Sequence, residues 1–159
     1  MTSRKVLITG AASGIGRVIA EAFLADGDDV HVCDASPDAI IEFLSANPSA
    51  TATQANVADT KDVDGLFETV DSLSILINNA GISGPSAAVE DVASEAWDDC
   101  IAVNLSRAFY MTHRAVPLMK KAKGGCIINM SSSAGLFGTP MRSPYAASKW
   151  GLIGLTKTW

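Results

Sequence analysis

A glycine-rich turn between an apolar strand and a helix constrains the fold of this chain more than any other feature. The turn spans residues 9–16 and has the spacing G-x-x-x-G-x-G. It follows an apolar run at residues 5–8, which predicts a buried strand, and precedes a helical pattern at residues 15–25. Glycines permit a tight turn, close approach to a phosphate, and close packing of helix on strand. Because helix N-termini favour negative charge, the turn predicts a dinucleotide phosphate site at Gly10, Ser13, Gly14, Ile15 and Gly16.

An aspartate at the end of the second apolar run bears on the choice of dinucleotide. Residues 30–33 predict a strand, and Asp34 follows it, 18 positions after Gly16. In dinucleotide folds an acid near this offset accepts hydrogen bonds from the adenosine ribose. It would also repel a 2′-phosphate, so we expect NAD rather than NADP. Two alternatives stay open: Asp34 could belong to a solvated turn, and Arg17 could reach a phosphate.

Strands and helices alternate along the remaining chain, which is typical of a parallel sheet with helices on both faces. We expect further strands at residues 50–55, 75–77 and 126–130. Helices are expected at residues 39–45 and 60–73, from an N-cap at Ser94 to about Met119, and from Pro144 to the end. Pro117 should disturb or bend the long helix near its end. The predicted fold class is α/β, a Rossmann-like doubly wound parallel sheet in a single domain, residues 1–159.

Composition excludes several classes of protein. A hydrophobic fraction of 48% with 18% charged residues indicates a globular chain, and a net charge of −5 argues against nucleic acid as a partner. No apolar stretch reaches transmembrane length, and the N-terminus leads directly into the first strand, so we expect a cytoplasmic protein. Cys33, Cys100 and Cys126 lack metal or redox spacing and are expected to be buried, reduced thiols. His31 and His113 are isolated, so we predict no metal site.

A tyrosine and a lysine four positions apart suggest acid/base chemistry. A helix that begins near Pro144 places Tyr145 and Lys149 on one face. An ammonium beside a phenol favours the phenolate, and a phenol that loses and regains its proton is a general acid/base. A Tyr–Lys pair by itself is more often an ordinary helix surface, but here it shares the chain with the glycine turn.

These motifs, together with Asn78-Asn79-Ala80-Gly81, occur in an order that resembles the short-chain dehydrogenase/reductase family over all 159 residues. The resemblance implies that Tyr145 is the catalytic acid/base and that Lys149 activates it and holds the nicotinamide ribose. It implies that Ser132 hydrogen-bonds the substrate oxygen, with a one-residue ambiguity among Ser131, Ser132 and Ser133. It implies that Asn104 carries a water that links Lys149 to solvent, although an asparagine within an apolar helix could be purely structural.

The resemblance also implies the remaining cofactor contacts. Asn56 and Val57 would hold the adenine ring, with Asn56 standing where many members have Asp. The family role of Asn79, Ala80 and Gly81 is to lie under the cofactor near the nicotinamide ribose. Asn78 is expected to brace neighbouring strands.

The implied function is an NAD(P)-dependent oxidoreductase that interconverts a secondary alcohol and a ketone. About five of the family's usual seven strands are present, so the alternative is an NAD-binding fragment without the substrate-binding C-terminal part. If these residues were the whole molecule, strand 126–130 would lie at a sheet edge. An NAD-sensing protein or a methyltransferase would have no need of Ser132, Tyr145 and Lys149.

Partners are less constrained than the site. We expect a small-molecule alcohol or ketone, whose identity stays open, and no membrane. Ile82, Leu136, Phe137 and Met141 could form an apolar wall for it, or could reflect ordinary packing. In the family, the helices around residues 94–119 and 144–159 commonly pair with a second subunit, which implies a homodimer or homotetramer.

Overall fold

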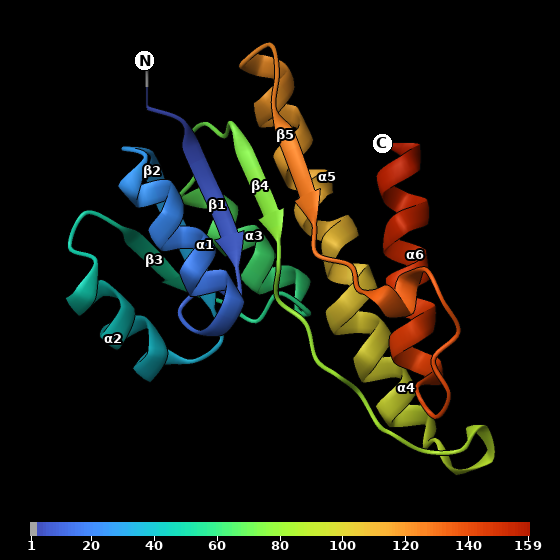
Figure 1. Ribbon diagram of the computed structural model, residues 1–159. Coiled ribbons are helices and arrows are strands. Elements are labelled where there is room, and N and C mark those ends of the chain that lie inside the picture. Colours follow the sequence, from blue (N-terminus) through green and yellow to red (C-terminus); the bar gives the residue numbers. More distant parts are fainter. Residues whose placement is uncertain (1–2) are drawn as a thin grey trace.

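The computed structural model describes residues 3–159 as a parallel sheet with helices on both faces (Figure 1). The sheet has five strands in the order β3-β2-β1-β4-β5. They are β1 (Lys5–Thr9), β2 (Asp29–Asp34), β3 (Thr51–Gln54), β4 (Ile75–Asn78) and β5 (Cys126–Asn129). The α/β doubly wound prediction is confirmed. Met1 and Thr2, which we assigned to the single domain, lie outside the described residues.

Helices cover both faces of the central strands, as the continuous apolar runs of a parallel sheet require. Val6 and Ile8 of β1 pack beneath α1 (Gly14–Ala25) and α2 (Pro37–Ala46). Leu7 points to the opposite face and packs with α3 (Thr60–Glu68) and α5 (Arg107–Lys121). Beyond α5, α6 (Ser143–Thr158) lies alongside α4 (Ser94–Ile101) (Figure 1).

The strand order fixes where a ligand can bind. β1 pairs with β2 on one side and β4 on the other, so the connections that leave β1 and β4 diverge to opposite faces. In an open parallel sheet, this reversal leaves a crevice outside the carboxyl ends of the two strands. The glycine turn follows β1 and residues 79–81 follow β4, so both motifs lie at the crevice.

The helices differ from the sequence predictions in several details. α3 ends at Glu68, and the Thr69 hydroxyl donates to the Leu66 carbonyl oxygen at 2.8 Å, which closes the helix before residue 73. The N-cap of α4 is Ala93 rather than Ser94. The expected long helix is interrupted by a π-helical turn, η2 (Ala102–Ser106). Pro117 lies within α5 without ending it.

One cysteine prediction is wrong. Cys33 and Cys100 are buried, but Cys126 is exposed because it begins β5, which pairs only with β4 and forms an edge of the described sheet. The apolar pattern of residues 126–130 does not reveal which strand lies at the edge.

Two short 3-10 turns complete the structure, η1 (Val89–Asp91) and η3 (Ser133–Gly135).

Replacing Gly16 by alanine should destabilise the protein by about 1–3 kcal/mol, because an added Cβ overpacks a closed contact. That Cβ would lie 2.5 Å from Asn79 Nδ2 and would also overlap the Gly10 carbonyl oxygen. Gly65→Ala is the matched control: its Cβ would meet nothing within 4 Å, and alanine at this exposed position of α3 should stabilise by up to about 1 kcal/mol. Urea unfolding of both variants measures the difference, and equal stability would contradict the packing described here.

Candidate functional site

The glycine turn has a backbone that only glycine adopts easily. Gly10 and Gly14 have φ angles of +59° and +56°, in the left-handed region. A Cβ on Gly10 would also lie 2.7 Å from the Ala80 Cα atom, so the turn touches the segment after β4 directly. The first and second glycines of the turn are therefore needed for different reasons: close approach and conformation at Gly10, conformation alone at Gly14.

The start of α1 is suited to an anion. Ser13 is the exposed N-cap, and its side chain makes no capping hydrogen bond to a described residue. The first turn of α1, within residues 14–25, contains no acidic side chain to compensate the positive end of the helix. The backbone N–H groups of such a helix start are a ready site for a phosphate. The residues present thus fit the pyrophosphate of a dinucleotide.

A buried threonine hydroxyl ties β1 to the segment after β4. Thr9 Oγ1 accepts hydrogen bonds from the backbone N–H groups of Asn79 and Ala80, each at 3.1 Å. In return, Asn79 Nδ2 donates to the carbonyl oxygens of Thr9 and Gly10 at 3.0 and 2.8 Å. These bonds hold the floor of the crevice against the glycine turn.

Asparagine 78 has the bracing role that we predicted. Its side-chain Nδ2 donates to Asn129 Oδ1 on β5 at 2.8 Å and to Thr112 Oγ1 on α5 at 3.4 Å. The first asparagine of the motif thus joins β4 to its neighbours, and the second joins β4 to the glycine turn.

Asp34 combines the two roles that the sequence left open. Its Oδ1 accepts from the Ser36 N–H at 3.1 Å, as in a turn, and its Oδ2 accepts from the Ala12 N–H at 3.1 Å. The half-buried carboxylate is therefore fixed against the glycine turn and faces the crevice.

The predicted cofactor residues share one cleft of about 570 Å³. All eleven that we predicted apart from Tyr145 and Lys149 line it: Gly10, Ser13, Gly14, Ile15, Gly16, Asp34, Asn56, Val57, Asn79, Ala80 and Gly81. Its volume lies within the usual range for a ligand site. At the adenine end, Val57 is buried, and Asn56 Oδ1 accepts from the Ala58 N–H at 3.1 Å, which leaves its amide N–H₂ exposed.

Tyr145 and Lys149 lie together on α6, as their spacing predicts. The Lys149 ammonium lies 5.6 Å from the centre of the Tyr145 ring and donates to the Met130 carbonyl oxygen at 2.7 Å. Only 5% of Lys149 is exposed. Burial, followed by the positive charge of Arg107, lowers the pKa of Lys149 to about 8. At neutral pH the lysine therefore still carries its charge beside the phenol.

Asn104 joins this pair to the cleft. The π-helical turn directs its buried side chain toward the loop after β4, where Oδ1 accepts from Ile82 N–H at 2.8 Å and Nδ2 donates to Ile82 O at 2.9 Å. A Cβ on Gly81 would lie 3.1 Å from Asn104 Oδ1 and 3.7 Å from Lys149 Nζ. Gly81 thus forms the boundary between the cleft and the Tyr145–Lys149 pair. The side chain of Asn104 is fully used by the protein, which supports the structural role that we left open.

The three serines differ in their contacts. Ser131 Oγ donates to the Lys149 carbonyl oxygen at 3.0 Å, so it anchors the loop to α6. Ser132 Oγ accepts from the Ala134 N–H at 3.2 Å and keeps its own proton to donate. Ser133 is exposed. Among the three, Ser132 is the half-buried hydroxyl that is free to donate to a substrate oxygen.

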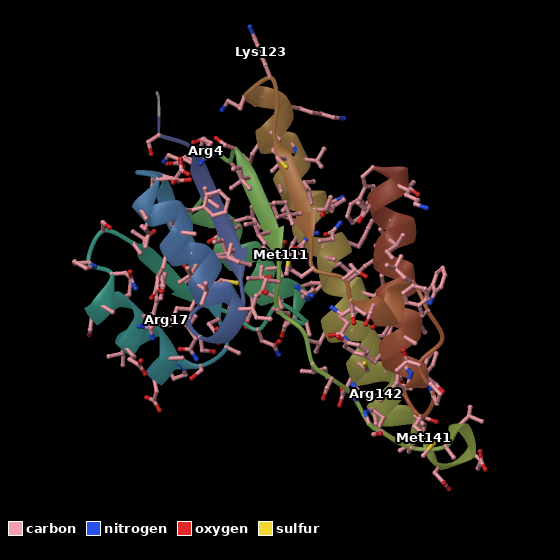
Figure 2. The ribbon with its side chains drawn as sticks, viewed as in Figure 1. Arg4, Arg17, Met111, Lys123, Met141 and Arg142 are labelled. Atoms are coloured by element: carbon pink, nitrogen blue, oxygen red, sulfur yellow. The ribbon has the colours of Figure 1, made fainter. Side chains whose placement is uncertain are left out.

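Two arginines beside the site were missed by the sequence analysis. Arg107 is fully buried, and its Nη1 donates to Thr9 Oγ1 at 3.1 Å. Arg142, on the loop that leads into α6 (Figure 2), lies with its guanidinium carbon 5.0 Å from the centre of the Tyr145 ring. An arginine in a helical pattern is usually exposed, so the sequence carried no signal for the burial of Arg107.

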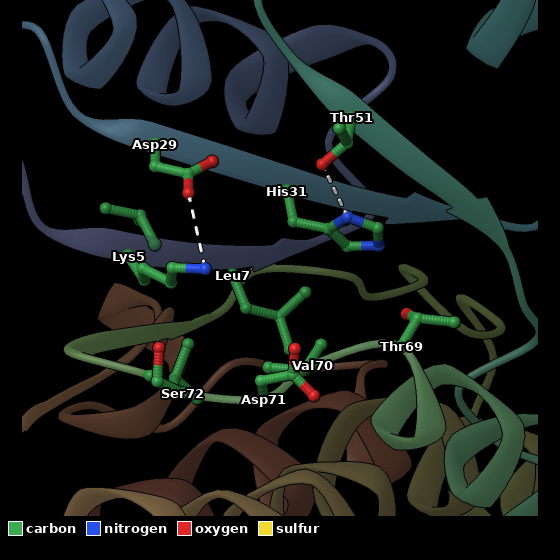
Figure 3. A pocket seen from close by; sticks show the side chains of 11 residues that line it. Lys5, Leu7, Asp29, His31, Thr51, Thr69, Val70, Asp71 and Ser72 are labelled. Carbon is green, nitrogen blue, oxygen red and sulfur yellow. Dashed lines mark hydrogen bonds and ion pairs between the residues drawn. The ribbon is translucent and has the colours of Figure 1, made fainter. Parts of the chain in front are cut away.

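A second, smaller pocket lies at the other end of the strands from the cleft. It has a volume of about 200 Å³ and lies at the amino ends of β1 and β2, beside the Lys5–Asp29 ion pair and His31 (Figure 3). Both ring nitrogens of His31 are engaged by threonine hydroxyls, Thr51 at 2.7 Å and Thr53 at 3.0 Å. Because doubly wound sheets bind ligands at their carboxyl ends, this pocket is not the dinucleotide site.

Comparison with known proteins identifies the family. The sequence profile of a family described as short chain dehydrogenase matches residues 4–159. The chain belongs to the short-chain dehydrogenase family. Among curated relatives, a 3-oxoacyl-acyl-carrier-protein reductase of Thermotoga maritima is 38% identical over 96% of this chain and 65% of its own length. A cyclohexanol dehydrogenase of an Acinetobacter species is 38% identical over 98% of this chain and 65% of its own length.

Solved structures of family members share the fold. An actinorhodin polyketide ketoreductase solved with NADPH superposes with a TM-score of 0.95 at 31% identity, over 98% of this chain and 63% of its own. An NAD⁺-bound xylitol dehydrogenase superposes with a TM-score of 0.93 at 27% identity, over 98% and 63% of the two chains. The present chain thus spans about 65% of the length of these two curated relatives. Within residues 3–159, no helix is long and apolar enough to cross a membrane, and no group of metal-binding side chains occurs.

Replacing Lys149 by methionine should raise the stability of this short-chain dehydrogenase at pH 7 by about 1–2 kcal/mol. The pKa of Lys149 is lowered in the folded state, so the unfolded chain binds the proton more tightly. The resulting cost is present in full below about pH 8 and disappears as the pH rises toward the unfolded pKa of 10.5. The stability gained in the Lys149 variant should shrink over the same pH interval. At every pH the gain is reduced by the loss of the hydrogen bond to the Met130 carbonyl.

Urea unfolding between pH 7 and 10 measures this gain. Lys157→Met removes an exposed charge from the same helix and should change stability by less than about 0.5 kcal/mol. A Lys149 variant that is less stable than the wild type at pH 7 would show that the ammonium is a net stabiliser.

Proposed function

We propose that this chain is the dinucleotide-binding and catalytic part of an oxidoreductase that interconverts a secondary alcohol and a ketone. The observation that carries the proposal is the Tyr145–Lys149 pair at the Gly81 boundary of the cleft, with the ammonium 5.6 Å from the phenol ring. A plain nucleotide-binding protein has no need of a buried lysine beside a tyrosine at that position. The family supplies the reaction class, and its relatives include both a reductase and a dehydrogenase.

The residues divide the chemistry as follows. A bound nicotinamide dinucleotide supplies or accepts a hydride at its ring. Tyr145 takes the proton of the substrate hydroxyl in oxidation and returns it in reduction. Lys149 stabilises the phenolate by its charge, and Ser132 donates a hydrogen bond to the substrate oxygen. Asn104 keeps the loop at Ile82 in place beside them, and its main chain is the proposed site of the water that connects Lys149 to solvent.

The cofactor contacts follow the cleft from end to end. We assign the adenine to Asn56 and Val57, the adenosine ribose to Asp34, and the pyrophosphate to the turn at Gly14. We assign the nicotinamide ribose to Asn79–Gly81 and Lys149. This direction agrees with the charges, since Asp34 lies at one end and the buried lysine at the other.

We propose NAD rather than NADP as the cofactor. Asp34 faces the cleft, and its carboxylate would repel a 2′-phosphate. Arg17, which is labelled in Figure 2, could have bound such a phosphate. Its guanidinium already bonds the carboxylates of Glu21 and Glu42, each at 2.9 Å. Structural relatives occur with either cofactor, so the argument depends on these residues of the present chain.

Exposed apolar side chains support two further expectations. Leu136, Phe137 and Met141 are exposed beside the catalytic loop and could contact an apolar substrate. A groove of about 490 Å³ between α5 and α6, lined in part by Leu105, Phe109 and Leu155, is suited to pairing with a second subunit in a dimer or tetramer.

A fragment that binds NAD without turnover is the second candidate, because the chain spans about 65% of the length of its curated relatives. Intact mass of the natural protein, followed by NAD reduction with a panel of secondary alcohols, separates the two. A mass that corresponds to these 159 residues alone, with no activity, would favour the fragment. Turnover by a longer polypeptide would favour the enzyme.

Replacing Tyr145 by phenylalanine should lower kcat by at least about 10²-fold and leave cofactor affinity within about threefold, because only the proton-carrying hydroxyl is lost. Tyr110→Phe is the matched control, since Tyr110 is the other tyrosine of the chain and lies on α5. Steady-state kinetics and cofactor titration measure both effects. Catalysis retained in the Tyr145 variant would exclude that residue as the acid/base.

Replacing Asp34 by asparagine should raise the kcat/KM for NADP relative to NAD by about tenfold. The substitution keeps an acceptor for the Ala12 N–H but removes the charge that repels a 2′-phosphate. Asp38→Asn, an exposed aspartate in the first turn of α2, is the control. An unchanged ratio in the Asp34 variant would show that this carboxylate does not select the cofactor.

A further inference from the structure

The most unusual charge in this chain is the guanidinium of Arg107. The side chain is 0% exposed, although it begins α5 and carries a full positive charge. Burial lowers its pKa to about 10, so it is still protonated at neutral pH. A buried charge of this kind is expensive unless it is paired.

No counter-ion offsets Arg107 within residues 3–159. Every ion pair found there involves a cation other than Arg107. None of the acidic side chains described lies within 4 Å of its guanidinium. Its hydrogen bonds go to neutral oxygens: Nη1 to Thr9 Oγ1 and Nε to the Val103 carbonyl. Nη2 is buried without a partner among the described residues. A buried polar group without a partner calls for an explanation.

The position of Arg107 supplies one. The hydroxyl of Thr9 that accepts from Arg107 also accepts from the N–H groups of Asn79 and Ala80, which line the cleft. Val103, one turn before Arg107, lines the same cleft. The guanidinium is thus connected to the cleft floor through a single residue, Thr9, and lies behind the nicotinamide end of the cleft. Its field reaches Lys149, because it contributes to the lowered pKa of that lysine.

We propose that Arg107 is a positioning residue whose unpaired charge makes the cleft bind the reduced dinucleotide more tightly than the oxidised one. The inference rests on the proposed function. The pyrophosphate and ribose groups are the same in both redox forms, so their contacts cancel in the comparison. The oxidised nicotinamide ring carries a positive charge that a cation behind the cleft floor repels, whereas the reduced ring is neutral.

This selection acts on the hydride step. In alcohol oxidation the C–H bond of the substrate breaks, its electron pair and hydrogen go to the nicotinamide ring, and the hydroxyl proton goes to Tyr145. The alcohol is oxidised and the dinucleotide is reduced, so atoms and electrons balance. Tighter binding of the reduced form shifts this equilibrium on the protein toward hydride acceptance. For a two-electron couple, a tenfold preference corresponds to about 30 mV in reduction potential.

The test compares the dissociation constants of NAD⁺ and NADH for the full-length protein without substrate. NADH is titrated by its fluorescence and NAD⁺ by competition against it. Arg107→Met and Arg107→Gln remove the charge, with the Gln amide still able to donate to the Val103 carbonyl in place of Nε, and Arg107→Lys retains the charge. Arg114→Met is the matched control, since it removes a cation from the same helix that is paired with Asp64.

In the wild type we expect NADH to bind more tightly than NAD⁺. The ratio of the two constants should fall by about tenfold in the Met and Gln variants and stay within about twofold in the Lys and Arg114 variants. A purely structural role for Arg107 would weaken both forms equally and leave the ratio unchanged. An unchanged ratio in either uncharged variant that folds overturns the proposal. If the wild type binds neither form, nor NADPH or NADP⁺, the proposed function itself fails.

Discussion

The cleft depends on one contact, between the carboxyl end of β1 and the segment that follows β4. Thr9 Oγ1 accepts from two backbone N–H groups of that segment, and the Asn79 side chain returns two hydrogen bonds to the turn. The glycines make this possible, because a Cβ at Gly10 or Gly16 would overlap atoms of the other segment. The start of α1, the cleft floor and the Gly81 boundary therefore lie on the segments that this contact joins.

The π-helical turn η2 positions side chains on the helical side of the cleft, as the glycines position the backbone of the cleft floor. A π-turn adds a residue to the helical repeat, which rotates the following helix, and such turns are frequent at functional sites. Here Asn104 lies within the turn and Arg107 directly after it. The rotation places Asn104 on the loop at Ile82 and Arg107 behind Thr9, so one irregularity in the helix positions both side chains.

Much of this arrangement could be predicted from the sequence, and the rest depends on packing that no local pattern encodes. The strands, the glycine turn and Asp34 are local signals, since apolar runs and turn residues act over a few positions. Eleven of the thirteen predicted cofactor residues accordingly share one cleft, and Tyr145 and Lys149 lie beyond its Gly81 boundary. The π-turn was invisible because its residues also suit an α-helix. The burial of Arg107 contradicts its residue type, and the exposure of Cys126 follows from the strand order, which local patterns do not give.

Two buried cations distinguish this region from the apolar core. Burial lowers the pKa of both Lys149 and Arg107, and the charge of Arg107 lowers the pKa of Lys149 further. A chain selected for stability alone would replace them with apolar side chains of similar size. We propose that these charges instead act on the dinucleotide that binds in the adjacent cleft. The two buried cations cost stability and place positive charge behind one end of the cleft, while Asp34 places negative charge at the other.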